Sequence, residues 1–179
     1  MTAATDGGAG RTETMAMTDG APREADNAGV ILPPPVIYLG FIALGGALHW
    51  LAPAGIGLGF DPGWPGRGLG ILLIGLAAGL GFLALCEFRR AGTNVDPHKP
   101  STAIITGGPF RWSRNPLYTG LAAIHAGVGL LAGSGWILIA LIPALVVIRY
   151  GVIAREERYL EAKFGDEYRA YMASVRRWI

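Results

Sequence analysis

Long apolar segments separated by short polar ones dominate the hydrophobic pattern from residue 30 onward. Four of these segments come close to the roughly 20 residues that an α-helix needs to cross a bilayer. We place the spans at about residues 35–52, 68–88, 117–132 and 136–153. Pro35 and Pro53 bracket the first span, because proline does not continue a helix from within. The pattern predicts an all-α integral membrane protein.

The pattern changes on either side of the spans. Residues 154–176 predict an amphipathic helix, bent or interrupted at Gly165, that lies on the membrane or against the preceding loop. Its apolar positions recur every three or four residues: Leu160, Phe164, Tyr168, Met172 and Val175. Residues 1–29 show no apolar periodicity and lack the features of a signal peptide, which predicts a disordered cytoplasmic tail. Residues 30–179 then form a single membrane domain.

Composition supports the membrane assignment. Hydrophobic residues make up 51% of the chain and charged residues 16%, against about 25% charged in a typical soluble domain. The net charge of +2 is too small to indicate a nucleic-acid partner. Cys86 is the single cysteine, and the three histidines are scattered without metal-ligand spacing. We therefore expect no metal site.

Arginine and lysine orient the spans. Five follow the second span and seven lie from Arg149 onward, whereas the connection before the second span holds only Arg67. By the positive-inside rule, both termini and the long loop after the second span are cytoplasmic. The loop and the amphipathic helix should therefore meet on one face of the membrane.

Thr106–Gly120 concentrates polar and rigid residues between two apolar segments, reading T-G-G-P-F-R-W-S-R-N-P-L-Y-T-G. Polar backbone beside a membrane must be satisfied by protein, water or a ligand. On the same predicted face, Glu156 and Glu157 are neighbours on a helix and point about 100° apart. One can face a bound cation while the other pairs with an arginine of the loop. The alternative is a solvated acidic patch at the start of a helix.

The second span contains small residues at helical spacing. Gly75, Gly79 and the alanines between them favour close packing of helices, and they could also support a homodimer. The alternative is a smooth wall against which a cofactor lies. Gly79-Leu80-Gly81 follows no strand, so it does not indicate a dinucleotide-binding fold.

Two motifs together resemble the isoprenylcysteine carboxyl methyltransferase family and the related phospholipid N-methyltransferases. The first is Thr106–Gly120, and the second reads E-E-R-Y-L-E-A-K-F-G-D-E-Y-R-A-Y from Glu156. The resemblance covers roughly residues 79–179. It implies S-adenosylmethionine bound in a cytosol-facing pocket and a lipophilic substrate that enters from the bilayer. The chain departs from the pattern at Asn115, where many members have histidine, and by an extra glycine at Gly107-Gly108.

The resemblance also implies roles for individual residues. One group would line the cofactor: Thr102, Ala103, Ile104, Ile105 and Phe110. The R-[NH]-P-x-Y turn would hold it through Arg114, Asn115, Pro116, Leu117 and Tyr118. Glu156 would bind the polar end of the cofactor. Gly79 and Gly81 match a G-x-G that the phospholipid branch assigns to the cofactor.

Methyl transfer from a sulfonium requires alignment and exclusion of water, without a metal or covalent nucleophile. An amine acceptor must lose a proton, and Glu157 is our candidate base. A carboxylate or thiolate acceptor could instead use Arg149 or Arg111. Arg149 could equally extend to the lipid headgroups. The acceptor itself stays open among a prenylated cysteine, a phospholipid amine, a small thiol and an isoprenoid acid.

The hypothesis is a methyltransferase of the bacterial inner membrane whose termini and active site are cytoplasmic. One alternative is a sterol-reductase-like membrane enzyme that uses NADPH, although such chains are longer and have more spans. A second is a non-enzymatic membrane protein whose loop and tail bind a partner. His125 lies alone among small residues of the third span, which is more typical of a packed, hydrogen-bonded residue than of a catalytic one.

Overall fold

A computed structural model describes residues 27–51, 58–96 and 99–178. Within these ranges the chain is helical and contains no strand, with a single isolated bridge between Gly59 and Ser134. The predicted all-α fold is therefore confirmed. The predicted tail lies almost wholly outside the described residues.

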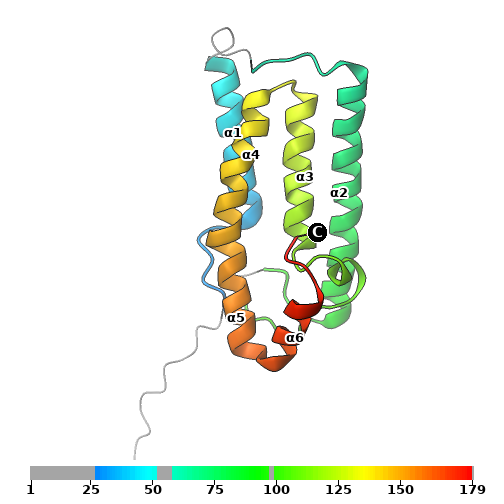
Figure 1. The fold of residues 1–179 in the computed structure, drawn as a ribbon, viewed down its shortest axis with the longest axis vertical. Coiled ribbons are helices and arrows are strands. Elements are labelled where there is room, and N and C mark those ends of the chain that lie inside the picture. Colours follow the sequence, from blue (N-terminus) through cyan, green and yellow to red (C-terminus); the bar gives the residue numbers. More distant parts are fainter. Residues whose placement is uncertain (1–26, 52–57, 97–98, 179) are drawn as a thin grey trace, which may run out of the picture.

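Four long helices stand side by side (Figure 1). They are α1 (Pro34–Leu51), α2 (Gly63–Ala91), α3 (Pro116–Leu131) and α4 (Gly135–Val147). A π-helical segment, Ile148–Ile153, joins α4 to α5 (Ala154–Phe164), so that α5 continues the line of α4 beyond the bundle. The short 3₁₀ helix η1 (Gly108–Arg111) precedes α3, and α6 (Asp166–Ser174) turns beneath the bundle.

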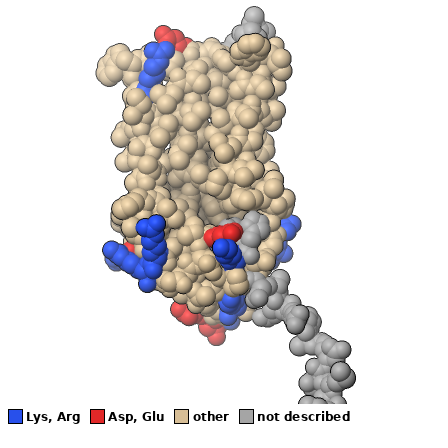
Figure 2. Space-filling view, turned by 180° about the vertical axis from the view of Figure 1, so that it is seen from behind, with Lys and Arg blue, Asp and Glu red and all other residues tan. Residues whose placement is uncertain are grey.

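Three helical segments are long and apolar enough to cross a membrane: Pro34–Leu51, Gly63–Ala91 and Gly135–Phe164. The fourth apolar helix, α3, is shorter, with 16 residues. Charged side chains gather at the two ends of the bundle and leave the middle of the visible face uncharged (Figure 2). At one end of the bundle, Arg67 in the second turn of α2 pairs with Asp61, which precedes the helix, at 3.3 Å. The molecule is therefore built as an integral membrane protein.

The helix bounds follow the predicted spans closely except at α2. This helix begins at Gly63, whereas we predicted a loop through Arg67. Pro65 fits the first turn because the N–H groups there have no helical partner to lose. The chain breaks as predicted at Gly165, whose φ of 56° ends α5 and starts α6. The helix continues through Pro143, and the chain departs from α-helical bonding at Ile148–Ile153.

Glycines bring α2 and α3 into backbone contact. A Cβ on Gly127 would lie 2.8 Å from the carbonyl oxygen of Gly70, and one on Gly70 would lie 2.9 Å from that of Gly127. Such close approach is typical of helix packing in membranes. The glycines that we expected to pack, Gly75 and Gly79, face away and would meet nothing within 4 Å. For these two glycines the expectation was wrong, because the rotation of α2 about its axis places Gly70 at the contact. Ala77, which lies between them, is buried and faces Gly120 of α3.

The core lies where α1 meets α4 and the π-helical segment. Tyr38, Ile148, Val152 and Ile153 are buried there together. His125 of α3 is completely buried, with its Nε2 2.9 Å from the carbonyl oxygen of Ile137 and its ring edge-on to Tyr38. The histidine is thus a packed, hydrogen-bonded residue, as its sequence surroundings indicated.

Replacing Gly127 with valine should destabilise the α2–α3 contact by about 1–3 kcal/mol, because the added carbons meet backbone that cannot move aside. The matched control is Gly75→Val in α2, where the space around the Cβ is open. Thermal unfolding in detergent measures both variants. An equal fall in the unfolding temperature of the two variants would show that an effect of valine on the helix itself, and not the α2–α3 contact, causes the loss of stability.

Candidate active site

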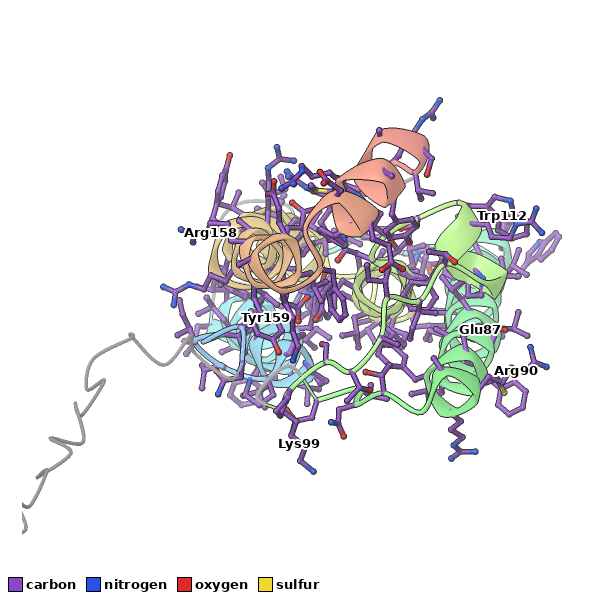
Figure 3. All side chains as sticks on the ribbon, turned by 90° about the horizontal axis from the view of Figure 1, so that it is seen from below. Glu87, Arg90, Lys99, Trp112, Arg158 and Tyr159 are labelled. Carbon is purple, nitrogen blue, oxygen red and sulfur yellow. The ribbon has the colours of Figure 1, made fainter. Side chains whose placement is uncertain are left out.

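A cavity of about 120 Å³ lies beneath the bundle, between the start of α3, the loop after α2, α5 and α6. Seen from below, the loop runs from the end of α2 towards α5 near Tyr159 (Figure 3), where the Ser101 N–H donates to the Tyr159 hydroxyl at 3.2 Å. Most of the predicted site residues line this cavity: Ala103, Ile104, Ile105, Phe110, Arg114, Asn115, Pro116, Leu117, Tyr118, Glu156 and Glu157. The sequence thus identified the elements that meet there.

Glu157 is buried in α5 and clamped by two arginines. Arg177 donates to both carboxylate oxygens, from Nε at 3.0 Å and from Nη2 at 2.5 Å. Arg114 approaches the Oε1 atom with its Nη2 at 3.2 Å. The predicted pairing of one glutamate with a loop arginine is therefore present. Since both oxygens already accept hydrogen bonds from guanidinium groups, this geometry suits an anchor better than a general base.

Glu156 has a different environment. Its Oε1 accepts a hydrogen bond from the Tyr118 hydroxyl at 2.6 Å, and it lines the cavity. No arginine or lysine in the described ranges pairs with it. A half-buried carboxylate without a cation is costly, so this position could hold a positively charged ligand group.

The chain beyond α6 is hydrogen-bonded to the site, which the sequence did not reveal. The N–H of Arg114 donates to the carbonyl oxygen of Arg176 at 2.9 Å, and the Asn115 side-chain amide donates to that of Arg177 at 2.9 Å. Tyr171 of α6 donates to the carbonyl oxygen of Phe110 at 2.7 Å. Burial raises the pKa of Tyr171 to about 12, so it remains a neutral donor at physiological pH. These contacts fasten α6 and the segment after it to the R-N-P turn.

The extra glycine of the loop has a structural reason. A Cβ on Gly107 would lie 2.6 Å from Glu87 Oε2, and one on Gly108 would lie 2.9 Å from Glu87 Cγ. Gly108 also has a φ of 53°, which side chains rarely adopt. Glu87 in turn pairs with Arg90 at 2.7 Å on α2. The two glycines therefore let η1 pack closely against α2.

An apolar groove of about 550 Å³ adjoins the cavity on the membrane side. Its walls come from the prolines before and in α1, from Ala77, Gly81 and Leu85 of α2, and from the first two turns of α3. Four residues line both spaces: Val95, Asp96, Leu117 and Tyr118. A cavity that contains charged side chains and a more apolar groove therefore meet at the start of α3.

Five predicted residues do not line the cavity. Gly81 lines the groove instead, and Gly79 faces the outside of α2. Thr102 is hydrogen-bonded to the chain just after α2, with its N–H donating to Thr93 Oγ1 at 2.9 Å. Arg111 is exposed at the end of η1, and Arg149 is exposed with its guanidinium carbon 5.6 Å from the centre of the Tyr150 ring. Lys99 and Arg158 also point away from the bundle (Figure 3).

The family model described as phospholipid methyltransferase matches residues 66–167, which is more than half of the chain. The chain belongs to this family. The matched range contains the first motif, most of the second and most of the residues that line the two spaces, and it implies a membrane methyltransferase. It ends before Tyr171 and Arg177, which contact Phe110 and Glu157 inside the matched range.

One similar protein is known from Haemophilus influenzae (strain ATCC 51907 / DSM 11121 / KW20 / Rd), where it is described as an uncharacterized protein. It is 44% identical over 63 residues, which cover 35% of this chain and all of that protein. No solved structure matches the chain. Membership of the family therefore rests on the family model, and the acceptor has to be inferred from the site.

Proposed function

We propose that the protein transfers a methyl group from S-adenosylmethionine to a lipophilic acceptor at the cytoplasmic face of a bacterial inner membrane. The observation that carries this proposal is that the cavity containing Arg114 and Glu156 meets the apolar groove at Leu117 and Tyr118. A water-soluble donor suits the first space, and an acceptor dissolved in the bilayer suits the second. The reacting atoms would meet where the two spaces join.

The cavity residues fit S-adenosylmethionine by their chemistry. Ile104, Ile105 and Phe110 offer an apolar wall for an aromatic base. Glu156, which lacks a cationic partner in the described chain, suits the ammonium or sulfonium of the donor. S-adenosylmethionine supplies the methyl group as an electrophilic carbon on sulfur, and the protein has to align it and exclude water.

Residues of the chain divide this work. Tyr118 orients the Glu156 carboxylate through its hydroxyl, while its carbonyl oxygen accepts from the Tyr38 hydroxyl of α1 at 3.2 Å. Glu157 and its two arginines hold α5 against the R-N-P turn. The apolar groove keeps water from an acceptor nucleophile, which strengthens electrostatic interactions near it. Arg111 and Arg149 lie outside both spaces and offer no direct contact in this arrangement.

Replacing Glu156 with glutamine should weaken S-adenosylmethionine binding by about 10-fold or more, because a charged hydrogen-bond partner of the ligand is lost. Isothermal titration calorimetry on the intact protein in detergent measures this. Glu161→Gln on the same helix is the control, since Glu161 pairs only with Arg169 at the surface. The proposal fails if the unaltered protein binds no S-adenosylmethionine or if Glu156→Gln binds it equally well.

A further inference from the structure

Arg114 is only partly used by the protein. Its side chain is 10% exposed, and its Nη2 lies 3.2 Å from Glu157 Oε1. The other two nitrogens, Nε and Nη1, are buried and have no hydrogen-bond partner within the described residues. A guanidinium group stays charged at any physiological pH and carries five donors, so two idle nitrogens in a buried position need a partner.

Glu157 does not require all of Arg114. Arg177 already makes a two-point pair with Glu157, reaching both carboxylate oxygens. Arg114 lines the cavity, whereas Arg177 does not. An anion in the cavity could take Nη1 together with the second hydrogen of Nη2, the paired geometry in which arginine binds carboxylates.

The same cavity presents the opposite requirement at Glu156, a carboxylate that pairs with no cation among the described residues. Arg114 and Glu156 line this one cavity together. A ligand with a carboxylate and an ammonium group on one carbon would satisfy both residues at once. An α-amino acid has this arrangement, and a purely cationic or neutral ligand does not.

We infer that the unused donors of Arg114 bind the carboxylate at the amino-acid end of the methyl donor, opposite Glu156. This inference rests on the proposed function and adds a second charged contact to it. Arg114 then acts in two directions: it holds Glu157 on one side and the donor carboxylate on the other. An arginine with a purely structural role would hold Glu157 alone.

Decarboxylated S-adenosylmethionine separates the two roles of Arg114. It lacks the carboxylate and keeps the sulfonium, the amine and the nucleoside. By calorimetry on the full chain in detergent, the unaltered protein should bind S-adenosylmethionine at least about 10-fold more tightly than the decarboxylated compound. Arg114→Gln should bind the two compounds within about 2-fold of each other, and Arg114→Lys should retain part of the preference.

Arg177→Gln is the matched control. It also loses a contact to Glu157 but removes no donor from the cavity, so its preference for the carboxylated compound should persist. A preference lost equally in Arg177→Gln and Arg114→Gln would assign the effect to the Glu157 cluster and overturn the inference.

The unaltered protein alone also decides the matter if Arg114→Gln does not fold. Equal affinity for the two compounds would overturn the role of Arg114 and leave the proposed function standing. Absence of binding to either compound would overturn the proposed function itself. A clear preference for S-adenosylmethionine supports both.

Discussion

Replacing Glu157 with alanine is expected to lower the free energy of unfolding by about 3–5 kcal/mol, the largest effect of any single change considered for stability. The carboxylate is buried between Arg114 and Arg177. Its removal leaves the buried Arg114 guanidinium without its only partner in the described chain. It also removes the carboxylate that pairs with Arg177.

Unfolding with sodium dodecyl sulfate in mixed micelles measures this effect. Glu161→Ala provides the comparison, because Glu161 lies on the same helix and pairs with Arg169 at 3.5 Å in an exposed position. An exposed pair contributes at most about 1 kcal/mol. Equal losses in the two variants would contradict the anchoring role of Glu157.

Filling the groove at Gly81 is expected to abolish most methyl transfer while leaving the donor site intact. A side chain on Gly81 would meet no atom within 4 Å at its Cβ, so the indole of Gly81→Trp can occupy groove space without displacing backbone. An acceptor held out of line loses transfer by about 100-fold or more. Affinity for S-adenosylmethionine should change by less than about 2-fold, because Gly81 does not line the cavity.

Transfer of labelled methyl from S-adenosylmethionine into the lipid extract of native membranes measures the loss, and calorimetry measures donor affinity. Gly79→Trp is the matched control, two residues away on the lipid-facing side of the same helix and equally open. If Gly81→Trp instead weakens donor binding, the G-x-G of α2 contacts the cofactor, as the family resemblance implies. If Gly79→Trp lowers transfer as strongly, the groove is not the path of the acceptor.

Most of the fold could be predicted from features of short stretches of sequence. Apolar length located the four long helices, and the absence of charge between residues 117 and 148 marked a hairpin within the membrane. The distinct roles of Glu156 and Glu157 followed from the angle between neighbouring residues on a helix. Each of these inferences depends on a few consecutive residues, which a sequence displays directly.

Contacts between distant segments could not be predicted in the same way. The segment after α6 is held largely through the carbonyl oxygens of Arg176 and Arg177, and every residue carries a carbonyl. The choice of Gly70 over Gly75 and Gly79 depends on how α2 is rotated against α3. The second arginine on Glu157 comes from 20 residues further along the chain. Neither the spacing of these residues in the sequence nor their type predicts these contacts.

The π-helical segment between α4 and α5 determines which glutamate does which task. A π turn holds one residue more than an α turn, and one residue corresponds to a rotation of about 100°. If Ile148–Ile153 were one residue shorter and α-helical, Glu157 would stand where Glu156 now meets Tyr118. Arg158 would then face Arg114, bringing two positive charges together. The length of this one turn therefore sets the rotation of α5 relative to α4, so that Glu156 faces Tyr118 and Glu157 faces Arg114.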